Sequence, residues 1–170
     1  MSKQITYSEA NQLISLGRKL SELEVIGLKE KLKSNPEDLR IRAMLISYYE
    51  HNPYDDTAQR MRAEHVLWII KNHPDSKVAA IPVIDLDPES NGANYFQAKK
   101  LWLDQIKKMP NSISILHNAV SFLSIHDKAL AEELLMKLMK LVPSTLGWQE
   151  RINFFKSIIK PKEKGKGVTH

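Results

Sequence analysis

Apolar residues recur along the chain at helical spacing, and prolines interrupt this pattern at similar intervals. The spacings are 38, 36 and 33 residues, measured between Pro36, Pro74, Pro110 and Pro143. Apolar side chains stand eight and four residues before each proline, a spacing that lines one face of a helix. After the proline the apolar pattern resumes, most clearly over 39–49 and 113–123. The pattern therefore predicts an all-α chain in which helix, proline turn and helix recur.

Local signals place the ends of these helices. Asn35 can cap a helix that starts with Pro36, because a proline at the first helical position loses no hydrogen bond. Ser21 and Glu24 have the spacing of a capping box, and Asp127 is placed to cap the helix that follows it. We expect nine helices, with the ranges 8–18, 21–33, 37–51, 57–72, 76–85, 93–108, 112–126, 128–141 and 146–160.

The segment from Ser112 to Pro143 resembles a tetratricopeptide repeat, in which about 34 residues form two antiparallel helices and a proline closes the second. Ala131 occupies the small-residue position twelve before the proline, and Ala98 fills the same position in the preceding copy. The run from Trp68 to Pro74 also resembles bacterial members of this superfamily. The match weakens in the earlier copies, where Glu24 and Arg62 replace the small residue.

The resemblance implies a right-handed helical-repeat solenoid of about four helix pairs. One pair cannot bury its apolar face alone, so neighbouring pairs stack and share a core. We expect a single domain at 1–160, which ends in a capping helix at 146–160, and a basic tail at 161–170. The weakest part of the pattern is 76–87, which is short and interrupted by Pro82.

Composition removes several function classes. The chain has no cysteine, which excludes disulfides, thiolate catalysis and metal sites with sulfur ligands. Of the net charge of +5, five lysines and one glutamate between Lys156 and Lys166 supply +4. The rest of the chain is nearly neutral, so nucleic acid is not the expected partner of the folded body. No apolar run is long enough to span a membrane and no secretory signal precedes the first helix, so we expect a cytoplasmic protein.

No motif predicts catalysis or a cofactor. The histidines of the helical region have no second histidine or carboxylate at the spacing of a helix-borne metal site. The loop with Asp85, Asp87 and Glu89 starts like a calcium-binding loop, but Ser90 stands where the turn needs glycine and Phe96 where a glutamate should close the shell. We therefore expect neither an enzyme nor a bound metal or cofactor.

In the tetratricopeptide family the first helix of each pair lines a concave groove, which implies a site for an extended or helical partner segment. The positions projected onto this face are Arg40, Ser47, Glu50, Val78, Ile81, Asp85, Ser114, His117, Ser121 and Ser124. Asn118 and Arg151 fall on two positions at which some family members clamp a C-terminal carboxylate, but the other clamp positions do not match. The sequence thus predicts a noncatalytic scaffold that binds a protein or peptide partner.

Two other functions stay open at this point. The basic tail could bind nucleic acid or an anionic surface, in which case binding would weaken steeply with salt and require the tail. An enzyme or metal protein would need side chains that come together only in the fold. Self-association is also compatible with an imperfectly capped solenoid.

Overall fold

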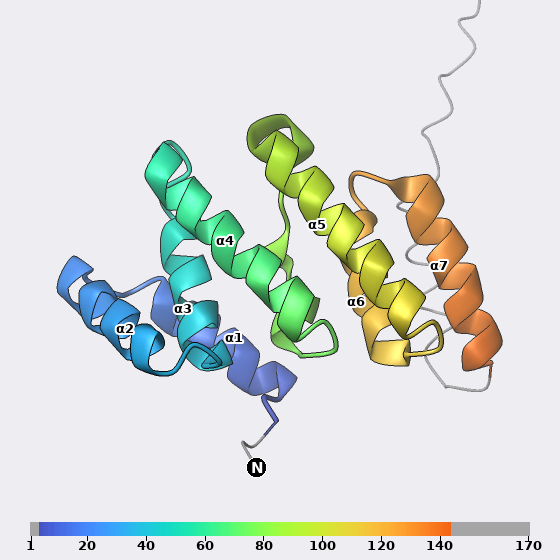
Figure 1. Cartoon of the computed structure of the whole chain (residues 1–170), viewed down its shortest axis with the longest axis horizontal. Helices are drawn as coiled ribbons and strands as arrows, with labels where there is room; N and C mark the ends of the chain where they lie inside the picture. Colours follow the sequence, from blue (N-terminus) through green and yellow to red (C-terminus); the bar gives the residue numbers. More distant parts are fainter. Residues whose placement is uncertain (1–3, 144–170) are drawn as a thin grey trace, which may run out of the picture.

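The computed structural model describes residues 4–143, which form seven α-helices and no strand (Figure 1). The all-α class expected from the sequence is confirmed for these residues. The helices are α1 (Tyr7–Gly17), α2 (Glu22–Ser34), α3 (Leu39–Glu50), α4 (Asp56–Asn72), α5 (Pro88–Lys108), α6 (Ile113–Leu123) and α7 (Lys128–Leu141). The predicted helix at 146–160, Arg151 and the tail at 161–170 lie outside the described residues.

Every described α-helix begins after a residue whose side-chain oxygen accepts a hydrogen bond from the first turn. These caps are Thr6, Ser21, Asp38, Asp55, Asp87, Ser112 and Asp127. The predicted capping box of Ser21 and Glu24 is confirmed. Asn35 is not the cap of α3, because Asp38 accepts from the amides of Arg40 and Ile41, each at 3.0 Å. The third helix therefore starts at Leu39, and Asn35 ends α2 instead.

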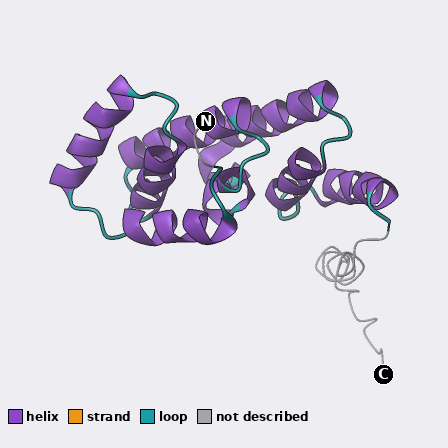
Figure 2. Ribbon diagram, turned by 90° about the horizontal axis from the view of Figure 1, so that it is seen from below, coloured by secondary structure: helices purple, strands orange, loops and turns teal. Residues whose placement is uncertain are grey.

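The helices pack as a row in which α1 lies against α3, α3 against α4, and α4 against α5. At the other end of the row α6 pairs with α7. Figure 2 shows the same helices from below, with the loops between them in teal. The apolar core runs through the row, and Trp102 of α5 is its largest fully buried side chain. No helix among the described residues is long and apolar enough to cross a membrane.

The segment expected as a fifth helix at 76–85 does not form an α-helix, which corrects the sequence prediction. It consists of two 3-10 turns, η1 (Val78–Ala80) and η2 (Pro82–Ile84), separated by Ile81 in an extended conformation. Pro82 explains the break, because proline has no amide to donate and disfavours helical backbone at the preceding residue. Since η1 contacts α4 and α6 while η2 contacts α3 and α6, the segment fills the slot between α3 and α6.

Helix α5 begins earlier than the pattern predicts, at Pro88 instead of near Ala93. Asp87 caps this start, and Pro88 occupies the first helical position, where its missing amide costs nothing. Gly92 then leaves the helical conformation (φ 1°, ψ −87°), so a kink separates the first residues of α5 from the rest. The helical spacing of apolar residues begins only after this kink, which is why the sequence pattern predicted that the helix starts at Ala93.

Candidate functional site

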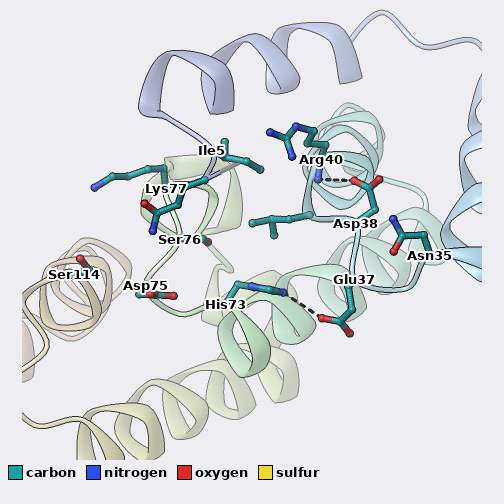
Figure 3. Close-up of a pocket in the computed structure, with 12 residues that line it drawn as sticks. Ile5, Asn35, Glu37, Asp38, Arg40, His73, Asp75, Ser76, Lys77 and Ser114 are labelled. Carbon is teal, nitrogen blue, oxygen red and sulfur yellow. Dashed lines mark hydrogen bonds and ion pairs between the residues drawn. The ribbon is translucent and has the colours of Figure 1, made fainter. Parts of the chain in front are cut away.

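A pocket of about 600 Å³ lies where four separate segments meet (Figure 3). Gln4 and Ile5 ahead of α1 form one wall, and residues between Asn35 and Arg40 form another. Residues between His73 and Lys77, after α4, form the third wall, and Ser114 at the start of α6 completes the lining. The pocket thus lies where two proline turns and the starts of α3 and α6 come together.

Two proline turns set the shape of this pocket. Asn35 caps the C-terminus of α2, and its carbonyl accepts from the Asp38 amide at 3.1 Å. His73 caps the C-terminus of α4, and its carbonyl accepts from the Ser76 amide at 3.1 Å. The same turn follows both helices because both carry a proline directly after the capping residue. The sequence repeat therefore places equivalent polar residues on two sides of one cavity.

Arg42 holds the turn before α3 through the Pro36 carbonyl, a contact that the sequence did not predict. Its guanidinium donates twice to the Pro36 carbonyl, from Nε at 3.1 Å and Nη2 at 2.7 Å. It also lies 3.6 Å from the centroid of the Trp68 ring and contacts His65 Nδ1 at 3.2 Å. In the sequence, the signal for this role was an arginine between two apolar residues, Ile41 and Ala43. The sequence does not show which carbonyl that arginine binds.

Burial lowers the pKa of His65 to about 4, and the nearby charges of Arg42 and Lys29 act in the same direction. The imidazole is therefore neutral near pH 7. Because Nδ1 accepts from the Arg42 guanidinium, the proton belongs on Nε2, which has no hydrogen-bond partner among the described residues. His65 thus serves to orient Arg42, which in turn fixes the wall of the pocket.

The charges on the pocket lining are mixed. The Arg40 guanidinium is paired with Glu9, with Nη2 at 2.8 Å and Nε at 2.9 Å from Oε1. His73 Nε2 lies 3.4 Å from Glu37 Oε2, which gives an ion pair when the imidazole is protonated, although the geometry is not that of a hydrogen bond. Lys77 extends toward the face of the Tyr7 ring at 5.5 Å. Carboxylates outnumber the cations that are not already paired.

Arg40 and Ser114 are the two predicted concave-face residues that line this pocket. They come from the first turns of α3 and α6, and the irregular segment between these helices contacts both. The remaining pocket residues were not predicted, because they lie in the proline turns, ahead of α1 or, for Leu39, at the first position of α3, and not on the projected helix face. The repeat of the prolines was the available signal, since it marks where equivalent turns stack.

Val78 and Ile81 are buried in the core and do not line an accessible face, which corrects the prediction for both. The projection assumed a helix over 76–85, and the 3-10 turns that replace it direct these side chains inward.

Ser47 and Asn118 are also buried instead of lining an open face. Ser47 donates to the Ile14 carbonyl at 2.8 Å, where α3 packs closely on α1. Asn118 donates to the carbonyls of Pro74 at 2.8 Å and Ser76 at 3.0 Å. Its amide fixes the turn after α4, and neither donor hydrogen is left for a carboxylate ligand.

Glu50 and Asp85 lie away from the pocket. Glu50 ends α3 and faces Arg18 at 3.6 Å, and Asp85 Oδ2 lies 3.7 Å from His126 Nε2. Burial raises the pKa of the Asp85 carboxyl, while His126 opposes part of that rise.

Arg62 stands at a position where the repeat pattern expects a small residue. It donates to the carbonyls of Val83 and Asp85, which shows why a long polar side chain replaces the small residue there.

Three further predicted residues lie along α6. Ser121 and Ser124 are half-buried and donate to carbonyls of the same helical stretch, at 3.1 and 3.0 Å. His117 is half-buried next to Asn118. Arg151 lies outside the described residues. The structure therefore divides the predicted face into a pocket at one end, buried positions in the middle and separate ion pairs at the other end.

No group of three or more histidine, aspartate or glutamate side chains could hold a metal ion among residues 4–143. In the acidic loop, Asp87 accepts from the amides of Glu89 and Ser90 and so caps α5.

Comparison of the chain with protein-family models, with curated proteins and with solved structures gave no match.

Proposed function

We propose that the chain is a noncatalytic interaction module whose pocket between the two proline turns holds an extended segment of a partner protein. The observation that carries this proposal is the pocket itself, which is polar and is lined from four separate segments. Its volume of about 600 Å³ falls within the roughly 300–1,000 Å³ that is usual for ligand sites. Four segments around one cavity give a ligand contacts on several sides.

The chemistry of the lining supports a peptide as the ligand. A peptide backbone carries both donors and acceptors, and side-chain amides such as those of Gln4 and Asn35 can bind both. Ser76 and Ser114 add hydroxyl groups that donate or accept. Ile5 and Leu39 supply apolar contact on the same lining.

The arrangement of the helices supports a tetratricopeptide-like array as the scaffold. Stacked helix pairs of this kind use side chains of neighbouring repeats to form one binding surface. Here α1, α3 and α6 bring their N-terminal ends to the same region, and the turns after α2 and α4 join them. We propose that this array fixes the pocket in advance of binding, which lowers the entropy cost of holding a flexible segment.

A random peptide library displayed on phage tests this function on the full chain. We expect enriched peptides whose affinity falls by roughly tenfold or more in Ser114→Trp, because the indole fills the pocket. Ser15→Trp is the matched control, since Ser15 is exposed on α1 and does not line the pocket. Enriched peptides that bind Ser114→Trp as well as the unaltered chain would exclude the pocket as their site.

A further inference from the structure

We infer that the partner segment presents an arginine or lysine side chain to the pocket, an inference that rests on the proposed function. Three carboxylates line the cavity, from Glu37, Asp38 and Asp75. They come from both proline turns, so they approach the space from two sides (Figure 3). The cavity between the turns therefore carries carboxylates from both of its proline-turn walls.

Each of these carboxylates has an oxygen left for a ligand. Asp38 uses Oδ1 for the two amides of the first turn of α3, and no hydrogen bond to its Oδ2 joins it to another described residue. Glu37 faces His73 through Oε2 alone. Asp75 is exposed and forms no hydrogen bond or ion pair with any described residue. The acceptors needed by a guanidinium or an ammonium group are present before the ligand arrives.

The cations on the lining do not cancel these charges. Arg40 is held by Glu9, which does not itself line the pocket. Lys77 lies toward the Tyr7 ring, at 5.5 Å from its centroid. The His73 imidazole faces Glu37 and is charged only when protonated. With Arg40 paired, Lys77 is then the one other cation among the described residues of the lining, against three carboxylates, so the pocket attracts a cationic group and repels an acidic one.

The apolar part of the lining fits the stem of such a side chain. Ile5 is buried against the core and Leu39 is half-buried, and both reach the pocket wall. Arginine and lysine place their methylene groups along apolar surface while the charged end stays with polar partners. Ile5 and Leu39 together with the three carboxylates provide both environments within one cavity.

The experiment uses the full chain with two small compounds, N-acetyl-arginine N-methylamide and its neutral counterpart N-acetyl-citrulline N-methylamide. Binding is followed by the amide signals of the protein in NMR titrations. We expect the arginine compound to shift signals of Asp75, Ser76 and Ser114, and to bind about fivefold more tightly than the citrulline compound, since exposed ion pairs add modest affinity. Raising the salt from about 50 to about 500 mM should remove most of that difference.

The Glu37→Gln/Asp75→Asn double variant should lose the preference for the arginine compound. Its matched control is Glu132→Gln/Glu133→Gln, which removes the same charge from exposed positions on α7 and should keep the preference. Equal binding of the two compounds to the unaltered chain would overturn the inference, whatever the stability of the variants.

The library selection separates this inference from the proposed function. If enriched peptides depend on Ser114 but carry no excess of arginine or lysine, the function stands and the cationic partner is wrong. If peptides do not depend on Ser114, the function itself is wrong. A selection dominated by basic peptides that depend on both Ser114 and Asp75 supports both.

Discussion

Single buried polar side chains hold the irregular parts of this molecule. Arg42, Arg62, Gln105 and Asn118 are all buried, and each donates two hydrogen bonds to backbone carbonyls near the end of a helix or in a turn. A carbonyl in such a place has no helical partner and would be costly to bury unpaired. Arg42 reaches back to the turn ahead of its own helix, and the other three side chains reach carbonyls of a neighbouring segment, so each residue fixes the position of two segments.

His65 gives the stability of the fold a dependence on pH. Its folded-state pKa is lowered to about 4, whereas the unfolded chain titrates near 6.5. Below pH 6.5 the unfolded state takes up a proton that the folded state does not, so stability present above this pH is lost as the pH falls toward 4. The shift corresponds to a loss of about 3 kcal/mol across that window.

We therefore expect His65→Leu to reduce the acid dependence of the free energy of unfolding, measured by urea denaturation at roughly pH 7 and pH 5. The variant also loses the contact to Arg42, so its stability at neutral pH should be lower than that of the unaltered chain. An unchanged difference between the two pH values would show that His65 does not titrate as described.

At the scale of the elements, sequence pattern was informative where it was local and periodic. The apolar period and the capping residues located all seven of the described helices, with ends that differ by a few residues except at the earlier start of α5. The segment at 76–85 has a similar apolar content, but a single proline decides its conformation and the neighbouring helices decide where its side chains point. Periodicity alone does not carry that tertiary information.

Two glycines in neighbouring helices provide a matched test of how closely the elements pack. A Cβ at Gly17 would lie 2.3 Å from the Met44 carbonyl oxygen of α3, while a Cβ at Gly27 meets nothing within 4 Å. Alanine favours a helix interior over glycine by about 1 kcal/mol. We expect Gly27→Ala to raise the free energy of unfolding by up to that amount, and Gly17→Ala to lower it by roughly 2 kcal/mol because α1 must move from α3.

Both variants are compared by urea denaturation, with circular dichroism as the signal. The opposite signs are the expected result. Stabilisation by both substitutions would mean that α1 and α3 are not in close backbone contact, and destabilisation by both would mean that α2 is not an exposed regular helix at Gly27.

For the molecule as a whole, the sequence located the repeat but not the site. The predicted surface assumed that every first helix of a pair is regular, and it therefore selected Val78 and Ile81, which the irregular segment buries. The pocket is built instead from turns that are about 38 residues apart in sequence, between Pro36 and Pro74. Which side chains face a shared cavity depends on how these turns stack, and no spacing in a linear sequence specifies that.

Asn118 links this global arrangement to binding. Its amide ties α6 to the turn after α4, so it positions the wall that carries Asp75 and Ser76 without lining the pocket itself. Asn118→Ala should leave two carbonyls without their partner and lower the free energy of unfolding by roughly 2 kcal/mol. It should also weaken binding of N-acetyl-arginine N-methylamide, because the turn is no longer held at its distance from Glu37.

Gln105→Ala is the matched control, since Gln105 also donates two hydrogen bonds to backbone carbonyls, those of Ile70 at 3.2 Å and Lys71 at 2.7 Å. These carbonyls lie within α4, ahead of the turn that forms the pocket wall. Both variants should lose similar stability, but only Asn118→Ala should bind the arginine compound more weakly in the NMR titration. Equal loss of binding in both would mean that affinity follows overall stability, and unchanged binding in Asn118→Ala would mean that the wall does not need this hydrogen bond to keep its position.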